Sequence, residues 1–259
     1  MRLILIAEDD AINREVILQQ VELLGYAAEI ANDGAAALLL WRAGRYALLL
    51  SDLDMPEMDG YSLAAAIRRE EAERGLPSQG RIPILAFTAN ALRGEASRAR
   101  AAGMDEYLTK PLKLDLLKDA LAKWLPREHG ETMPAELTEV PGGALETPAV
   151  DVAVLKGMVG DDPETVREFL SDYRDSTRQL ATEIGAARAA GDMRQIGAIV
   201  HKLKSSSRSV GALALGDLCA ALENDCRAGE LDAVLRGLAR FDAALLAVGA
   251  RIGQLLERP

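Results

Sequence analysis

The strongest constraint on the fold is a change of pattern part-way along the chain. Up to about residue 125, short apolar runs alternate with longer amphipathic stretches, and from about residue 151 onward amphipathic stretches follow one another without such runs. Apolar runs of about four to eight residues are typical of buried strands, whereas apolar residues repeated every three or four positions over a longer stretch are typical of helices. The sequence therefore predicts an α/β region followed by an all-α region.

The first region predicts a parallel sheet with helices on both faces. We expect strands at residues 3–7, 26–30, 46–51, 82–87 and 106–109. We expect helices at about residues 11–24, 34–42, 60–73, 91–101 and 113–125. Strands and helices in strict alternation indicate a doubly wound α/β domain, in which functional groups gather at the carboxyl ends of the strands.

The rest of the chain predicts a linker and a helical bundle. Residues 126–150 hold four prolines and three glycines without a sustained apolar period, which indicates a flexible linker. We expect helices at about residues 151–158, 162–189, 192–209, 211–228 and 231–256. Long helices with short breaks are typical of a four-helix bundle, here with a short leading helix. The predicted domains are thus residues 1–125 and 151–259, joined by the linker.

Charge and hydropathy argue against two classes of function. The formal net charge is −10, whereas direct binding of nucleic acid requires a basic surface. No apolar run approaches the ~20 residues of a membrane-spanning helix, and the first ten residues do not have the pattern of a secretory signal. We therefore expect a cytoplasmic protein that neither binds nucleic acid directly nor inserts into a membrane.

Acidic side chains follow two of the predicted strands. Glu8 and Asp9 come after the first strand, and Asp52 and Asp54 come after the third. The carboxyl ends of parallel strands meet at one edge of a sheet, so these residues are expected to lie close together. Crowded carboxylates repel one another unless a cation lies among them, and oxygen ligands of this kind favour Mg²⁺. The sequence therefore predicts a magnesium site.

Two further polar residues lie at the ends of the fourth and fifth strands. Thr88 supplies a hydroxyl and Lys110 a compact positive charge, and both can hold phosphoryl oxygens. A metal, a nucleophilic carboxylate, a hydroxyl and a lysine together indicate a phosphoryl-transfer site. The nearby acids Asp10 and Asp59 each precede a predicted helix, where we expect them to act as N-caps.

The motifs of the first region resemble those of a response-regulator receiver domain. They are AEDD (7–10), SDLDMPEMDG (51–60), FTAN (87–90) and EYLTKP (106–111). The resemblance covers residues 1 to about 125 and implies a flavodoxin-like fold. It also implies that Asp52 is the phosphoacceptor, and that Mg²⁺ is held by Glu8, Asp9, Asp52 and the backbone carbonyl of Asp54.

The same resemblance implies roles for three residues near the other strand ends. Thr88 would be the switch hydroxyl, Lys110 the phosphate-sensing lysine, and Tyr107 the aromatic residue whose rotamer follows the state of Thr88. A second family is left open, because Asp52 and Asp54 after an apolar strand also fit the DxD signature of haloacid-dehalogenase-type phosphatases. The acidic metal motif of that family has no counterpart after the fourth strand, which favours the receiver interpretation.

The two histidines of the chain lie in different contexts. His129 falls in the predicted linker, and we assign it no role. His201 begins the segment HKLKSSSRSVGA (201–212), which resembles the signature of a histidine-containing phosphotransfer (HPt) domain and implies that His201 is phosphorylated. Lys204, Ser205 and Arg208 would surround the phosphoryl group. The chain departs from the family at Ser205, where glycine is frequent.

A glycine lies one turn before this histidine on the same predicted helix. Gly197 costs the helix about 1 kcal/mol relative to alanine. We interpret it, together with Ala198, as small residues that let the concave site of another protein close over His201.

Both resemblances together predict a phosphorelay protein. An acyl phosphate on Asp52 would exchange with a phosphoramidate on His201, within one chain or between chains. Neither a P-loop nor a kinase glycine loop occurs in the sequence. We therefore expect a phosphotransfer protein with self-catalysed phosphorylation of Asp52, rather than a kinase. Its expected partners are a sensor histidine kinase and the receiver or HPt domains of other relay proteins.

Two alternatives for the receiver region are left open. The protein could be an adaptor that phosphorylation switches through Thr88 and Tyr107, without transfer to His201. It could also be a phosphate sink, in which Asp54 and Asn90 tune the attack of water on the phosphorylated aspartate.

Overall fold

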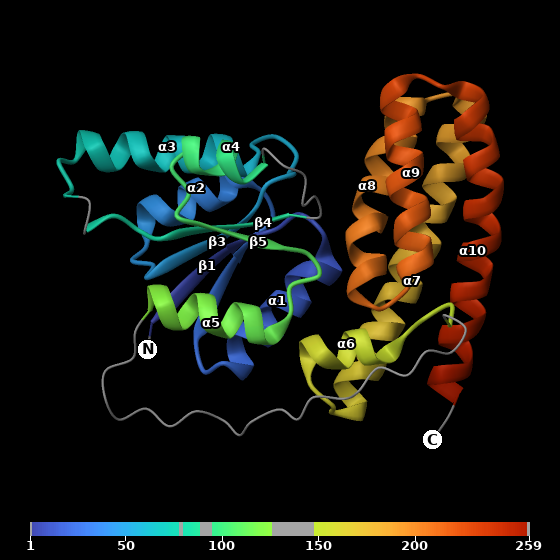
Figure 1. The fold of residues 1–259 in the computed structure, drawn as a ribbon, viewed down its shortest axis with the longest axis horizontal. Helices are drawn as coiled ribbons and strands as arrows, with labels where there is room; N and C mark the ends of the chain where they lie inside the picture. Colours follow the sequence, from blue (N-terminus) through green and yellow to red (C-terminus); the bar gives the residue numbers. More distant parts are fainter. Residues whose placement is uncertain (1, 78–79, 89–94, 126–147, 258–259) are drawn as a thin grey trace. The chain divides into compact units, whose positions relative to one another are not determined.

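The computed structural model describes residues 2–77, 80–88, 95–125 and 148–257 (Figure 1). The chain divides into two compact units, residues 1–138 and 139–259. Most of the predicted linker, residues 126–150, lies outside the described residues, as does His129. Among the helices in the described ranges, none has the length and apolar character needed to cross a membrane.

Unit 1 contains a five-stranded sheet whose strands are all parallel and lie in the order β2-β1-β3-β4-β5. The strands are β1 (Leu3–Ala7), β2 (Ala27–Ala31), β3 (Leu48–Asp52), β4 (Ile84–Thr88) and β5 (Glu106–Thr109). This order is that of a flavodoxin-like doubly wound fold. It confirms the fold class predicted from the sequence, and each strand lies within two residues of its predicted start.

Helices cover both faces of this sheet (Figure 1). They are α1 (Ala11–Leu23), α2 (Gly34–Ala43), α3 (Gly60–Glu73), α4 (Glu95–Ala101) and α5 (Leu114–Trp124). Successive side chains of a strand point to opposite faces, so β1 contributes Ile4 and Ile6 to the core beneath α1 and α5. Leu5 and Ala7 enter the core beneath α2, α3 and α4.

Two of the acids near the strand ends are helix caps, as the sequence predicts. Asp10 begins α1, and its carboxylate accepts the backbone N–H of Asn13 at 2.9 Å. Asp59 begins α3, and its carboxylate accepts the N–H of Ser62 at 2.7 Å. Each carboxylate satisfies a donor that the first helical turn leaves without an intrahelical partner.

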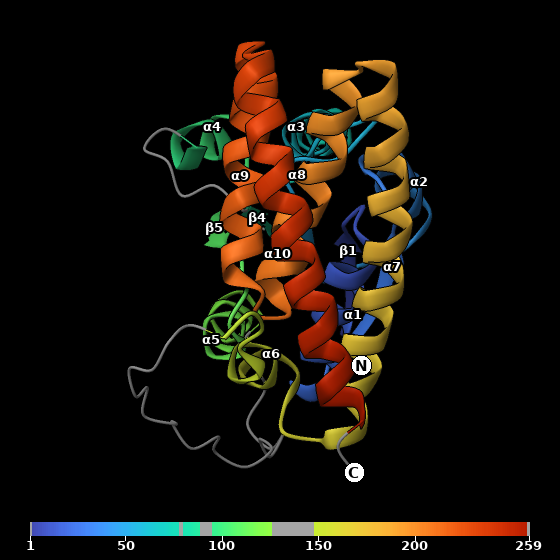
Figure 2. The same ribbon diagram turned by 90° about the vertical axis from the view of Figure 1, so that its right-hand side faces the viewer.

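Unit 2 consists of helices joined by short turns, with no strand among its described residues. Its helices are α6 (Val152–Val159), α7 (Pro163–Ala190), α8 (Met193–Ser209), α9 (Leu213–Ala228) and α10 (Leu231–Glu257). Figure 2 shows the four long helices, α7 to α10, running side by side as a bundle, with the short α6 at one end. Within this bundle, α8 packs against both α7 and α9, and α10 packs against α7 and α9.

The turn between α8 and α9 anchors the start of α6. The N–H of Asp151 donates to the carbonyl of Gly211 at 3.0 Å. Gly211 has a φ of 82°, and a Cβ at this position would lie 2.0 Å from the carbonyl oxygen of Asp151. Only glycine combines this backbone conformation with so close an approach.

Candidate functional site

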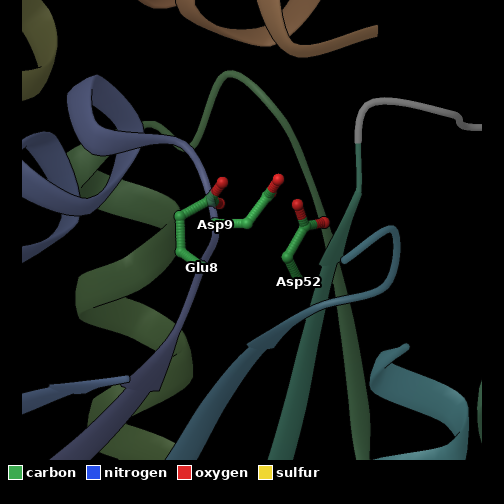
Figure 3. Close-up of side chains that lie close together, drawn as sticks. All are labelled: Glu8, Asp9 and Asp52. Atoms are coloured by element: carbon green, nitrogen blue, oxygen red, sulfur yellow. The ribbon is translucent and has the colours of Figure 1, made fainter. Parts of the chain in front are cut away.

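Three carboxylates meet at the carboxyl ends of β1 and β3 (Figure 3). Glu8 and Asp9 follow β1, Asp52 is the last residue of β3, and one oxygen from each lies within 4.8 Å of the other two. The pairing of Ala7 with Ser51 brings these two strand ends to the same level. A set of carboxylate oxygens fits a hard divalent cation such as Mg²⁺.

Lys110 joins two of these carboxylates. Its Nζ lies 2.6 Å from Oε2 of Glu8 and 2.7 Å from Oδ2 of Asp52, and its side chain is only 6% exposed. Burial alone would lower the pKa of Lys110, but the negative charges of Asp52 and Glu8 raise it above its ordinary value. Burial raises the pKa of Glu8, and the nearby lysine opposes that shift. The ammonium therefore compensates negative charge among side chains that are almost fully buried.

Backbone contacts on either side of Lys110 fix its position. Its N–H donates to the carbonyl of Thr88 at 2.7 Å, which extends the pairing of β4 with β5. The peptide bond between Lys110 and Pro111 is cis. Beyond it, the buried Gln20 of α1 donates from Nε2 to the carbonyl of Leu112 at 2.6 Å. This role of Gln20 could not be predicted from the sequence, because it depends on how α1 lies against the loop.

The loop after β3 orients the carboxylate of Asp52. Its Oδ1 accepts the N–H of Leu53 at 2.7 Å and that of Asp54 at 3.5 Å, while Oδ2 faces Lys110. The first residue of α3 closes over this loop, since a Cβ on Gly60 would lie 2.1 Å from the backbone oxygen of Asp52. Glycine at this position therefore lets α3 begin directly against the strand end.

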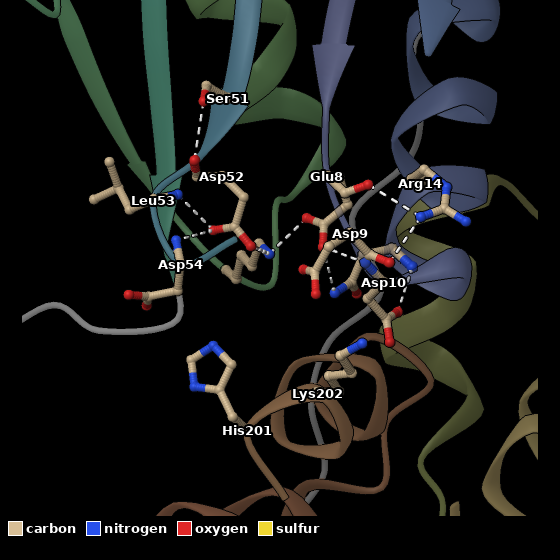
Figure 4. Close-up of polar contacts among 12 residues, drawn as sticks. Glu8, Asp9, Asp10, Arg14, Ser51, Asp52, Leu53, Asp54, His201 and Lys202 are labelled. Carbon is tan, nitrogen blue, oxygen red and sulfur yellow. Dashed lines mark hydrogen bonds and ion pairs between the residues drawn. The ribbon is translucent and has the colours of Figure 1, made fainter. Parts of the chain in front are cut away.

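A second basic residue, Arg14, holds the loop that carries the acid pair (Figure 4). Its guanidinium donates to the backbone carbonyls of Glu8 at 3.1 Å and Asp9 at 2.8 Å. The side chain of Glu8 also accepts the N–H of Asp10 at 3.2 Å. This role of Arg14 was not predicted from the sequence, because it depends on where the side chain lies on the first turns of α1.

The remaining predicted receiver residues lie on the same edge or close to it. Thr88 is the last residue of β4 and is fully buried. Tyr107 lies on the neighbouring β5, half-buried, and packs against the core beneath α2, α3 and α4. Asp54 is exposed in the loop after β3. Asn90 lies outside the described residues.

In unit 2, His201 belongs to a cluster of charged side chains on α8 and α9. Its Nδ1 lies 2.9 Å from Oε1 of Glu223, and Nζ of Lys204 lies 2.8 Å from Oε2 of the same carboxylate. Arg227 donates to Oε1 of Glu223 at 2.8 Å. Partial burial alone would raise the pKa of Glu223, but its hydrogen bonds to His201 and Lys204 lower it to about 2. The sequence did not point to Glu223, because helix pairing decides which face of α9 meets α8.

Two residues near His201 make contacts that were not predicted from the sequence. A Cβ on Gly197 would lie 3.3 Å from Cβ of Cys226 on α9, so this glycine serves the close packing of α8 against α9. Arg208 forms an ion pair with Asp217, with 2.8 Å between a guanidinium nitrogen and Oδ1. Ser205 is buried. Of the residues expected around the phosphoryl group, Lys204 is the one that reaches the cluster of His201.

Comparison with known families agrees with the geometry of both units. The family described as the response regulator receiver domain matches residues 4–122, and the Hpt domain family matches residues 168–251. The chain joins a receiver domain to an Hpt domain. Both resemblances stated from the sequence are thereby confirmed, and the haloacid-dehalogenase alternative for the receiver region is set aside.

Curated relatives match the receiver and Hpt domains together. The virulence sensor protein BvgS of Bordetella pertussis is 32% identical over 248 residues, which cover 93% of this chain and 20% of that protein. The sensor protein EvgS of Escherichia coli K12 is 30% identical over 204 residues, which cover 79% of this chain and 15% of that protein. The chain therefore spans a fifth or less of these two relatives.

Two solved structures are each similar to about half of this chain. The receiver domain of sensor histidine kinase PA1611 from Pseudomonas aeruginosa PAO1, solved with a magnesium ion in its active site cleft, is 38% identical. The match covers 48% of this chain and 96% of the PA1611 receiver chain, with a TM-score of 0.43. A chain in the complex of Saccharomyces cerevisiae Ypd1 with the receiver domain of Ssk1 is 29% identical. The match covers 48% of this chain and 88% of that chain, with a TM-score of 0.45.

Proposed function

We propose that this chain passes phosphoryl groups between Asp52 of its receiver domain and His201 of an Hpt domain. The observation that carries the proposal is the position of Asp52, whose carboxylate has one oxygen on the backbone N–H of Leu53 and the other on Lys110. A carboxylate held in this way presents a fixed nucleophile beside a positive charge. That is the arrangement that phosphoryl transfer requires.

In the receiver domain, Asp52 attacks the phosphorus of a phosphohistidine. An O–P bond forms, the N–P bond breaks, and the imidazole leaves with the electron pair of that bond. Glu8, Asp9, Asp52 and the backbone carbonyl of Asp54 would hold a Mg²⁺ ion, which neutralises phosphoryl oxygens when bound. Lys110, already between two carboxylates, neutralises the remaining charge.

The phosphoryl donor we propose is a sensor histidine kinase, and the further partners are receiver or Hpt domains of other relay proteins. The relatives that match both domains carry the name of sensor proteins, which supports a place in such a relay. Transfer between Asp52 and His201 within one chain and transfer between chains are both compatible with the chemistry.

Labelling the full chain with a radioactive small acyl phosphate and Mg²⁺ tests this function. We expect alkali-labile label on Asp52 and acid-labile, alkali-stable label on His201. Asp52→Ala should abolish both labels, and His201→Gln should abolish the second alone. Asp59→Asn keeps a helix cap in the same loop and should change neither.

Other labelling patterns would contradict the transfer. Label confined to Asp52 would favour the adaptor, or the phosphate sink if the label were lost within seconds. Label on His201 that survives Asp52→Ala would show that the histidine is phosphorylated independently of the receiver domain.

A further inference from the structure

One face of α10 in the Hpt domain is apolar and exposed to solvent. The helix packs against α7 and α9 with its buried side, and Figure 2 shows it along the near side of the bundle. On its outer side, Leu235 is 44% exposed and Leu246 is 76% exposed. Residues 243–250 include no charged or polar side chain. A continuous apolar strip at the surface marks an interaction site rather than a scatter of single exposed residues.

The exposed apolar positions have the spacing of a contact between two helices. They are Leu235, Ala239, Leu246, Ala250 and Gly253, separated by 4, 7, 4 and 3 positions. Residues three, four and seven positions apart stay on the same face of a helix, and this spacing lets two helices pack side by side. The outer face of α10, defined by these five residues, therefore fits another helix.

Two glycines near the C-terminal end of α10 support the close approach of a second helix. A Cβ on Gly249 or on Gly253 would meet nothing within 4 Å among the described residues. Packing within the bundle therefore does not require glycine at these positions, although glycine disfavours a helix interior relative to alanine. A missing side chain leaves a hole into which a leucine of a facing helix can pack.

The two edges of the outer face of α10 carry opposite charges. Asp242 lies on the edge toward α7, where it pairs with Arg188 at 3.0 Å, and its side chain is still 51% exposed. Arg240 is exposed and lies on the edge toward α9. It follows Gly237 by three positions, and a Cβ on Gly237 would lie 2.6 Å from the side chain of Leu222 on α9.

We propose that two copies of this chain associate through the outer face of α10, with the two helices parallel about a two-fold axis. In a parallel pair, each edge of one helix faces the opposite edge of the other. Arg240 of each copy then lies beside Asp242 of the second copy. An antiparallel pair would instead place like edges together, with the arginine edge against itself. The association goes beyond the proposed phosphoryl transfer, whose chemistry requires no second copy of α10.

Sedimentation velocity of the full chain over a range of micromolar concentrations tests the association. We expect a monomer–dimer equilibrium whose Kd rises at least about tenfold in Leu246→Asp, because the contact would bury an unpaired charge. Arg240→Glu should raise the Kd about fivefold, because two carboxylates would then meet at each edge. Arg194→Glu makes the same change of charge at an exposed residue of α8 and should leave the Kd unchanged.

Cysteine cross-linking of the full chain tests the orientation of the two helices. In a Cys226→Ser background, Leu235→Cys and Leu246→Cys should each give a disulfide-linked dimer under mild oxidation. Parallel helices in register bring every position of the outer face next to the same position of the second copy, within reach of a disulfide. An antiparallel pair brings only one position next to itself. Arg194→Cys on α8 is the control and should not be linked.

Three results would overturn the inference. One is a chain that stays monomeric at every concentration, and another is a dimer that a folded Leu246→Asp variant retains with unchanged Kd, because that dimer would form through another surface. The third is cross-linking at fewer than both of the two leucine positions, which contradicts the parallel arrangement. Circular dichroism shows whether each variant is folded. All of these measurements use unphosphorylated protein, so they do not depend on transfer between Asp52 and His201.

Discussion

Nζ of Lys110 lies 2.7 Å from Oδ2 of Asp52, although 58 positions separate the two residues in the sequence. The same Nζ lies 2.6 Å from Oε2 of Glu8. The parallel sheet explains this meeting, because β1, β3 and β5 all end at the same edge. One buried ammonium thus lies between two carboxylates that would otherwise repel one another.

Replacing Lys110 by methionine should lower the rate of phosphorylation of Asp52 at least tenfold. Methionine keeps the length of the side chain but removes the charge that compensates the transferred phosphoryl group. The measurement is acyl-phosphate labelling over time. Lys113→Met removes an exposed lysine that makes no capping hydrogen bond at the start of α5, and it should leave the rate unchanged. Equal rates for both variants would contradict this role of Lys110.

Gly60→Ala should destabilise the receiver domain by about 2 kcal/mol or more. The added methyl would lie 2.1 Å from the backbone oxygen of Asp52 and 3.0 Å from Cα of Leu53, so strand and helix must move apart. The two tryptophans of the chain, Trp41 and Trp124, lie in α2 and α5, so tryptophan fluorescence in urea reports on this domain.

Gly185, which has free space around it, is the control for that substitution. A Cβ on Gly185, within α7, meets nothing within 4 Å. Gly185→Ala should stabilise the Hpt domain by about 0.5–1 kcal/mol, because alanine favours a helix more than glycine does. The unfolding transition of the receiver domain, followed by tryptophan fluorescence in urea, should not change. A Gly60→Ala receiver domain as stable as the wild type would show that the loop after β3 can relax at little cost.

The receiver site could be predicted from the sequence because topology alone brings its residues together. Strands such as LILIA are apolar throughout, which marks them as central strands of a parallel sheet, and the acids directly follow them. Once the sheet is parallel, Glu8 and Asp52 must share an edge whatever the details of packing. The loop contacts of Arg14 and Gln20 needed side-chain positions that the pattern does not contain.

The surroundings of His201 were harder to predict, because helix packing rather than topology sets them. The apolar period shows that α8 has a buried stripe but not which residue of α9 lies opposite His201. Which residue lies there depends on how closely α8 approaches α9 at Gly197 and Cys226. A Cβ on Gly197 would lie 3.3 Å from Cβ of Cys226. Glu223 reaches the imidazole through that packing, and Arg208 is drawn to Asp217.

The hydroxyls of Tyr173 and Ser207 should be coupled in the stability of the Hpt domain. Their oxygens lie 2.8 Å apart between α7 and α8, and both residues are buried. Tyr173→Phe and Ser207→Ala should each lower the free energy of unfolding by about 1–2 kcal/mol. Each substitution removes this hydrogen bond and leaves the other buried hydroxyl without it. The double variant should cost less than the sum. Strict additivity in urea unfolding would show that the two hydroxyls do not interact.

The contacts of Glu223 should make the Hpt domain lose stability in acid. Its pKa is about 2 in the folded protein against an ordinary value of 4.5, so its stabilising contribution is complete above about pH 4.5 and is lost as pH falls toward 2. The groups that face this carboxylate are His201 and Lys204 on α8 and Arg227 on its own helix. The contribution is on the order of 2 kcal/mol.

Glu223→Gln removes this titration while keeping the shape of the side chain. The wild type should therefore exceed the variant in unfolding free energy at pH 6, and the difference should shrink as pH falls below about 4.5. Urea titrations followed through the backbone amide signals of α8 and α9 measure it for this domain alone. Asp242→Asn, at an exposed ion pair, should differ from the wild type by less than about 1 kcal/mol at pH 6. A wild-type advantage that stays constant from pH 6 to pH 2.5 would mean that Glu223 is not held by these charges.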